Sequence, residues 1–128
     1  MNVPHQAKIL PFRQPLRLKG IPCQFSPIPE NVSAFWLHRL SRPQILTYHY
    51  ICRRTLGYRK SRDSIALSQF STGVRTRDGK ILDEGVGYSK STVLRALRDL
   101  ESLGLLRRYT GRGKLTVYEP LYPLPLDD

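Results

Sequence analysis

The clearest pattern of apolar and polar positions lies in the stretch GYSKSTVLRALRDLESLGLL, residues 87–106. Its apolar residues recur at steps of three and four, a spacing that places them on one side of an α-helix. Ser89 is the natural N-cap of such a helix, and Gly104 is its C-terminal stop. The pattern therefore predicts a helix between these two residues with one buried side. That side consists of Val93, Ala96, Leu97, Leu100 and Leu103.

Two more segments with a helical period precede this one. ENVSAFWLHRL predicts a short helix with Asn31 or Ser33 as its cap, and SRPQILTYHYICRRTLGY predicts a longer helix that Ser41 caps and Gly57 ends. Pro43 fits the first turn of the longer helix, where its missing N–H is not needed. We expect the longer helix to be the central scaffold. The apolar residues are Phe35, Trp36, Leu37 and Leu40 in the first helix, and Ile45, Tyr48, His49, Cys52 and Leu56 in the second.

Short extended segments lie between these helices and the last one. SIALSQF predicts a strand over residues 65–67, followed by a brief helix that Ser68 caps and that ends near Gly73. In VRTRDGKILDEGVG, the pair Asp78-Gly79 is a strong turn signal between two extended runs. We therefore expect a small hairpin or an ordered loop before the last helix.

The segment after the last helix alternates on either side of a glycine-rich basic tip. LLRRYTGRGKLTVYEPLY predicts two strands joined by residues 111–113, and the prolines of PLYPLPLDD end the second strand. The predicted order is helix, helix, strand, short helix, longer helix and two-stranded hairpin, which is the layout of a winged helix-turn-helix domain. We expect a mainly α fold of the α+β class, in which the C-terminal two-stranded hairpin is the wing.

Residues 1–29 differ in composition from the rest of the chain. They hold six of the ten prolines and no acidic residue. Such a segment forms neither a regular helix nor a central strand. We expect an extended basic N-terminal arm, which is either a disordered tail or an element that orders on phosphates or on a partner protein. The winged-helix domain would cover residues 30–119, and a short proline-rich tail would cover 120–128. The candidate contacts of the arm are Arg13, Arg17 and Lys19.

The overall charge narrows the class of partner. The chain of 128 residues carries 21 Lys and Arg against 10 Asp and Glu, a formal net charge of +11. This excess favours a polyanion, with nucleic acid ahead of an anionic membrane surface. The apolar runs are far shorter than the roughly 20 residues of a membrane span, and the N-terminus lacks the apolar core of a signal peptide. We expect a cytoplasmic, nucleoid-associated protein that makes no membrane contact.

Cysteine and histidine residues do not indicate a cofactor. Cys23 and Cys52 are far apart and form no C-x-x-C pair, and the three histidines have no metal-ligand spacing. His49 falls inside an apolar helical pattern, so we assign it to the core. We expect no metal site, no cofactor and no redox role.

No catalytic set is apparent either. Asp63, Asp78, Asp83 and Glu84 lie in predicted loops, and nothing in their spacing brings them together to hold a nuclease metal. The hydroxyls at the start of the last helix have no obvious base except Lys90, which the helix turns elsewhere. We therefore expect a binding protein rather than an enzyme, with no small-molecule substrate.

The polar side of the last helix carries the candidate chemistry. Its first two turns are basic and hydroxyl-bearing, although the helix macrodipole favours acids there, at a cost of about a few tenths of a kcal/mol or more. This placement is understandable if a phosphate binds the free N–H groups of the first turn. Arg95 and Arg98 then reach base edges, where a bidentate arginine–guanine contact contributes roughly 1–3 kcal/mol of discrimination. The alternative is that this polar side of the helix is only solvated and binds nothing. The candidate recognition residues are Ser89, Lys90, Ser91, Thr92, Arg95 and Arg98.

The predicted wing shifts the balance towards double-stranded DNA as the partner. It adds several cations with no acid between them, and the glycines beside Arg112 let the backbone come close to a sugar-phosphate chain. The candidate wing residues are Arg107, Arg108, Arg112 and Lys114.

Three segments also carry a family resemblance. They are FSPIPENVSAFWLHRLSRPQILTYHYICRRTLGYRKSRDSIALSQF, GVRTRDGKILDEGVGYSKSTVLRAL and LESLGLL, of which the middle one, with its R-D-G turn and its D-x-G-x-G-x-S-x-S-T-V run, is the most specific. From about Phe25 to Tyr109 the chain resembles the winged-helix origin-binding domain of phage and mobile-element replication initiators, the family of the phage lambda O protein's N-terminal domain.

The resemblance implies a mode of binding and a biological role. It implies that Lys90, Ser91, Thr92 and Arg95 enter the major groove of a repeated sequence in a replication origin, with the wing over the adjacent backbone. Initiators of this family generally carry a second region that recruits the replicative helicase or its loader. Here the proline-rich arm is the segment left for contacts with replication or nucleoprotein-complex proteins.

Three hypotheses follow for the function. The first is a sequence-specific DNA-binding initiator or accessory factor of a phage or mobile element. The second is a winged-helix transcription regulator, which the sequence separates poorly from the first. The third is an interaction subunit of a larger nucleoprotein complex, whose basic face holds RNA or a guide complex.

Overall fold

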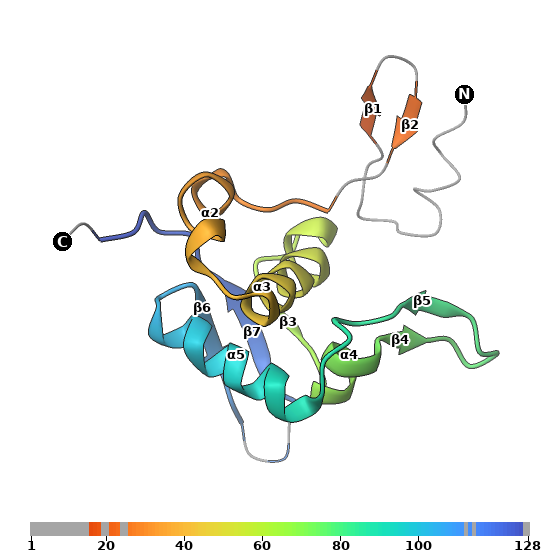
Figure 1. The fold of residues 1–128 in the computed structure, drawn as a ribbon. Coiled ribbons are helices and arrows are strands. Elements are labelled where there is room, and N and C mark those ends of the chain that lie inside the picture. Colours follow the sequence, from red (N-terminus) through yellow and green to blue (C-terminus); the bar gives the residue numbers. More distant parts are fainter. Residues whose placement is uncertain (1–15, 19–20, 24–25, 112, 114, 127–128) are drawn as a thin grey trace.

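The computed structural model describes residues 16–18, 21–23, 26–111, 113 and 115–126. This part of the chain contains four α-helices and three small antiparallel sheets, so the fold belongs to the α+β class (Figure 1). The helices are α2 (Glu30–Phe35), α3 (Arg42–Arg54), α4 (Leu67–Thr72) and α5 (Lys90–Ser102), with 3₁₀ turns η1 (Leu37–Arg39) and η2 (Leu56–Tyr58). The strands are β1 (Leu16–Leu18), β2 (Ile21–Cys23), β3 (Asp63–Ser64), β4 (Val74–Arg75), β5 (Ile81–Asp83), β6 (Leu106–Tyr109) and β7 (Val117–Pro120).

Helices α3 and α5 begin directly after the serines that the sequence analysis predicts as their N-caps. At the start of α3 the Gln44 backbone N–H donates to Ser41 Oγ over 3.4 Å, and the Ser41 N–H donates to Gln44 Oε1 over 2.9 Å, which completes a capping box. At the start of α5 the Thr92 N–H donates to Ser89 Oγ over 3.3 Å. Both predicted N-caps are confirmed.

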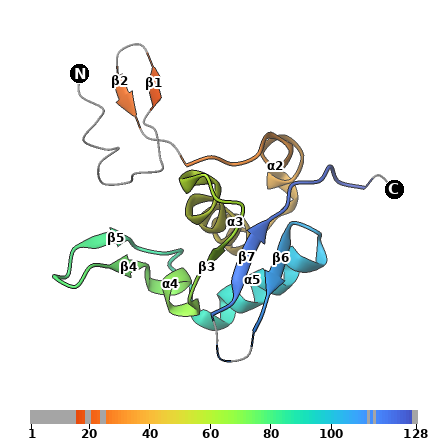
Figure 2. The ribbon, with the colours of Figure 1, turned by 180° about the vertical axis from the view of Figure 1, so that it is seen from behind.

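The core lies where α3, α4 and α5 meet the three-stranded sheet. Helix α5 packs against α3 and α4. Figure 2, the view from behind, shows the sheet in front of α3 and α5, which β7 and β6 contact. Its strand order is β3-β7-β6, so the short strand before α4 pairs with the last strand of the chain. The largest fully buried side chains are Tyr48, Phe70, Ile51, Ile65, Leu97, Leu100 and Leu105.

The region around α4 differs from its predicted form. The predicted strand over residues 65–67 is wrong: the strand is Asp63–Ser64, and Ile65 is buried in the core. The predicted cap Ser68 is also wrong, because Ala66 holds the N-cap position and its N–H donates to Gln69 Oε1 over 3.2 Å. The Gln69 side chain thus satisfies the N–H of the N-cap residue, and α4 begins without a side-chain cap on the N–H groups of its first turn.

Three predicted core positions are also corrected. Phe35 is 47% exposed and Leu103 is likewise exposed, while Val32 takes the buried position on α2. His49 is only half-buried and lines a cavity of about 170 Å³ together with Arg53. Helix α3 ends at Arg54, so the predicted stop Gly57 lies instead inside η2.

The proline-rich tail is bound to the folded body. The Tyr48 hydroxyl donates to the Leu121 carbonyl over 2.8 Å, and Trp36 Nε1 donates to the Pro123 carbonyl over 2.8 Å. The strand before the tail ends at Pro120, as predicted. The described part of this tail is therefore continuous with the structure of α2 and α3.

The N-terminal arm contains an element that the sequence did not predict. Strands β1 and β2 pair with each other in an antiparallel hairpin, with Leu16 opposite Cys23. Of the candidate arm residues, Arg17 lies in β1, and Arg13 and Lys19 lie outside the described residues. No helix in the described part of the chain has the length and apolarity needed to cross a membrane.

Candidate nucleic-acid interface

The start of α5 presents a cluster of hydroxyl groups. Ser89 Oγ lies 3.1 Å from Ser91 Oγ and 3.1 Å from Thr92 Oγ1, and all three side chains reach the surface. The first turn contains no acidic residue. The first backbone N–H groups of a helix have no partner within it and point along the axis. This end of α5 therefore offers several hydrogen-bond donors to an anion.

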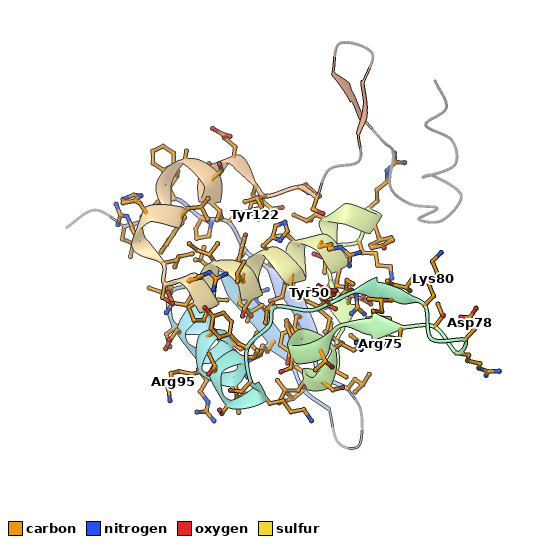
Figure 3. All side chains as sticks on the ribbon, turned by 45° about the vertical axis from the view of Figure 1, so that its right-hand side comes forward. Tyr50, Arg75, Asp78, Lys80, Arg95 and Tyr122 are labelled. Carbon is orange, nitrogen blue, oxygen red and sulfur yellow. The ribbon has the colours of Figure 1, made fainter. Side chains whose placement is uncertain are left out.

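The cations of α5 are exposed and unengaged. Lys90, Arg95 and Arg98 form no ion pair within the residues that the structure describes, and all three are exposed. Figure 3 shows Arg95 pointing away from the body of the protein. The opposite side of the helix is buried through Val93 and Leu97. Five of the six candidate residues of this helix are exposed, and Thr92 is half-buried. We call these six residues the α5 face.

The predicted wing cations do not share one environment on the strands after α5. The predicted hairpin is confirmed as β6 and β7, with Arg107 opposite Glu119. Arg107 is exposed, and a hydrogen bond with Tyr109 raises the pKa of its guanidinium. Arg112 and Lys114 lie outside the described residues.

Arg108 has a different environment from the one that the sequence analysis expects. Its Nε and Nη2 atoms both donate to Glu101 Oε1, over 3.0 and 2.7 Å. Neighbouring residues of a strand point to opposite faces, so Arg107 and Arg108 cannot serve the same surface. Arg108 therefore joins β6 to the end of α5, and we remove it from the candidate interface.

Three acidic residues bind side chains of α3. Arg53 Nη1 binds Asp83 over 3.0 Å, and Arg54 Nη2 binds Asp63 over 3.3 Å. Asp99 accepts a hydrogen bond from Gln44 Nε2 over 3.0 Å. These three acids therefore join α3 to β5, β3 and α5.

The acidic residues that the structure describes lie apart from one another or are bound by neighbouring side chains. Among the described residues, no group of three or more His, Cys, Asp and Glu side chains is placed to hold a metal ion. Asp63 and Asp83 each bind an arginine, and the Asp78 carboxylate accepts a hydrogen bond from the Thr76 hydroxyl. Burial raises the pKa of the Cys52 thiol to about 12, so this side chain stays protonated and unreactive at neutral pH.

A second set of exposed cations was missed as a candidate site. Arg75, Arg77 and Lys80 lie on the hairpin of β4 and β5, whose formation the sequence predicted. The signal was present, because the three cations flank the Asp78-Gly79 turn. The turn was interpreted as a connection only.

Comparisons of the chain with family models, with curated proteins and with solved structures found no match.

Proposed function

We propose that this chain is a sequence-specific, double-stranded DNA-binding protein with a winged helix-turn-helix fold. The order α3, β3, α4, α5, β6, β7 and the sheet order β3-β7-β6 support this fold, because both are those of winged-helix domains. In this assignment α5 is the recognition helix and the β6–β7 hairpin is the wing.

The observation that carries the proposal is the α5 face. Lys90 stands beside three hydroxyls at the N-terminal end of α5, where the helix dipole attracts an anion, and Arg95 and Arg98 follow along the helix. None of these three cations forms an ion pair with a residue that the structure describes. A phosphate bound by Lys90 and the hydroxyls fixes the position of the helix on the duplex. Arg95 and Arg98, one and two turns further on, then lie in the major groove, where an arginine distinguishes guanine by two hydrogen bonds.

The biological role that we propose is a replication initiator or accessory factor of a phage or mobile element. The resemblance of residues 25–109 to origin-binding domains supports this role. Such a protein binds repeated sequences in an origin, so we expect cooperative binding to adjacent repeats. Selection of bound duplexes from a random library at a stated salt concentration gives the site, and two adjacent copies of it then test the cooperativity.

The Arg95→Ala variant should separate sequence reading from general affinity. It should bind the selected duplex more weakly by roughly 1–3 kcal/mol, because a bidentate base contact is lost, while its affinity for unrelated duplexes stays nearly unchanged. Titration of labelled selected and scrambled duplexes, at matched salt, measures both quantities.

Arg39→Ala is the matched control for this test. Arg39 is also an exposed arginine without an ion pair in the described part, but it lies beside Ser102 and Leu103, at the other end of α5 from Lys90. Equal losses for Arg95→Ala on every sequence would mean that α5 does not read bases. Equal affinity for duplex RNA and duplex DNA would also contradict the proposal, since the A-form major groove is too narrow to admit a helix.

A further inference from the structure

The hairpin of β4 and β5 projects from the body between α4 and α5 (Figure 1). It is inserted at the position of the turn between the last two helices. Val74 pairs with Asp83 and Arg75 with Ile81, so the strands are antiparallel and short. Its end lies well away from the core, and Figure 3 shows Arg75, Asp78 and Lys80 along this projection. Residues 77–82 of this hairpin are all exposed, so the hairpin contributes little to the core. Its presence therefore points to a role other than stabilising the fold.

Hydrogen bonds hold the tip of this hairpin in one conformation. The Thr76 N–H donates to the Lys80 carbonyl over 2.9 Å, and the Lys80 N–H donates to Thr76 Oγ1 over 3.0 Å. The Gly79 N–H donates to the Thr76 carbonyl over 3.0 Å. The Thr76 hydroxyl also donates to the Asp78 carboxylate, and this bond lowers the pKa of Asp78. The one acid of the tip is thus engaged in forming the turn.

The base of the hairpin is fixed to the helices. Asp83 Oδ2 accepts from Arg53 Nη1 over 3.0 Å and from the Tyr50 hydroxyl over 3.2 Å, which ties β5 to α3. The Val86 N–H donates to the Phe70 carbonyl over 2.7 Å, which ties the following segment to α4. A hairpin anchored in this way keeps a defined direction relative to α5.

The cations of the hairpin are available for a ligand. Arg77 and Lys80 are exposed, and neither side chain forms an ion pair or a hydrogen bond within the described part of the chain. Arg75 Nη1 donates to the Thr72 carbonyl over 3.2 Å, so this guanidinium is positioned against the end of α4 and still exposed. The hairpin also exposes Ile81 and Leu82, at 49% and 43%.

We propose that the β4–β5 hairpin is a second DNA-binding element, an inference that rests on the function proposed above. Arg75, Arg77 and Lys80 bind backbone phosphates of the same duplex, outside the base pairs that α5 reads. Two features favour this ligand. Residues 84–89 connect the hairpin directly to the start of α5. Cations on a hairpin of fixed direction, beside exposed apolar side chains, suit a sugar-phosphate backbone and the edge of a groove.

The position of the hairpin predicts where its contacts fall. Figure 3 shows Arg75 and Lys80 on one side of the molecule and Arg95 on the other, so a duplex that meets both must extend beyond the α5 face. The hairpin contacts are therefore expected in one flank of the site. Because phosphate contacts carry no base information, this flank can have any sequence.

The test compares two duplexes and two variants. One duplex is trimmed to the base pairs that show a preference in the selection, and the other keeps about ten further base pairs of arbitrary sequence on each side, roughly one helical turn. The Arg77→Ala/Lys80→Ala double variant should bind the long duplex about 10-fold more weakly at 0.1 M salt and lose about two units of salt slope. It should bind the trimmed duplex like the unmodified protein, and its hydroxyl-radical footprint on the long duplex should shorten at one end.

The controls distinguish failure of this inference from failure of the proposed function. Arg39→Ala should leave the footprint and the salt slope on the long duplex nearly unchanged, and thermal unfolding checks that the double variant is folded. The double variant can match the unmodified protein on both duplexes while Arg95→Ala loses specificity. In that case the hairpin does not bind DNA, as expected of an element that binds a protein, and only this inference fails. If the double variant loses affinity equally on both duplexes, the hairpin contacts do not lie in the flank of the site, and the inference is wrong. If Arg95→Ala and the unmodified protein behave alike on all duplexes, the proposed function fails, and the hairpin inference fails with it.

Discussion

The Phe70→Ala variant should unfold with a free energy about 3–5 kcal/mol lower than that of the unmodified protein. The Phe70 side chain is 0% exposed, and its ring packs edge-on against Tyr118, with centroids 5.1 Å apart, and tilted against Tyr50 at 5.4 Å. It therefore joins α4 to both α3 and β7. Truncation removes this contact area and leaves a cavity that the surrounding rigid elements cannot fill. Urea unfolding followed by circular dichroism measures the change.

Phe35→Ala is the matched control for that measurement. The chemical change is the same, but Phe35 is 47% exposed, so we expect a loss below about 1 kcal/mol. A domain of this size is stable by roughly 5–15 kcal/mol, so Phe70→Ala should remove a large share of the total. Similar losses in the two variants would mean that Phe70 does not occupy the core position that the structure gives it.

The sequence predicted the elements whose signals are local. The caps Ser41 and Ser89 act within three residues, and the apolar spacing of α3 and α5 follows from the helical period itself. The turn at Asp78-Gly79 is also a local signal, and it gave the β4–β5 hairpin correctly. These elements needed no knowledge of what they pack against.

The sequence did not predict features that depend on how different elements pack against each other. Whether Val32 or Phe35 faces the core is set by how α2 meets the tail, where Trp36 binds the Pro123 carbonyl. The pairing of Arg108 with Glu101 depends on how β6 returns past the end of α5. In both cases the residue types alone do not identify the neighbours of the side chain.

The candidate site divides in the same way. The α5 face was predictable, because five of its six residues lie in one helix, whose period fixes their direction, and Ser89 caps that helix. The hairpin cations were not predicted as a binding site, because they can contact a duplex next to α5 only if the hairpin has a fixed direction. That direction comes from Arg53 and Tyr50, which bind Asp83 from 30 and 33 residues away along the chain.

Gly73→Ala tests the fixed direction of the hairpin at its base. Gly73 has φ 86° and ψ −163°, a conformation that is almost restricted to glycine, and a Cβ atom there would lie 2.0 Å from the Asp83 carbonyl oxygen. The atom it meets is backbone, so β5 must move away from the end of α4. We expect a loss of about 3 kcal/mol in unfolding free energy, again measured by urea unfolding.

Gly79→Ala separates the steric contact from the backbone conformation. Gly79 has a similar φ of 88°, but a Cβ atom there has no neighbour within 4 Å, so only the conformational cost of about 1 kcal/mol applies. The folded fraction of Gly73→Ala should also bind the long duplex more weakly and with a smaller salt slope, whereas Gly79→Ala should bind nearly as the unmodified protein does. Equal losses of stability in the two variants would show that the close approach of β5 to Gly73 does not set the position of the hairpin.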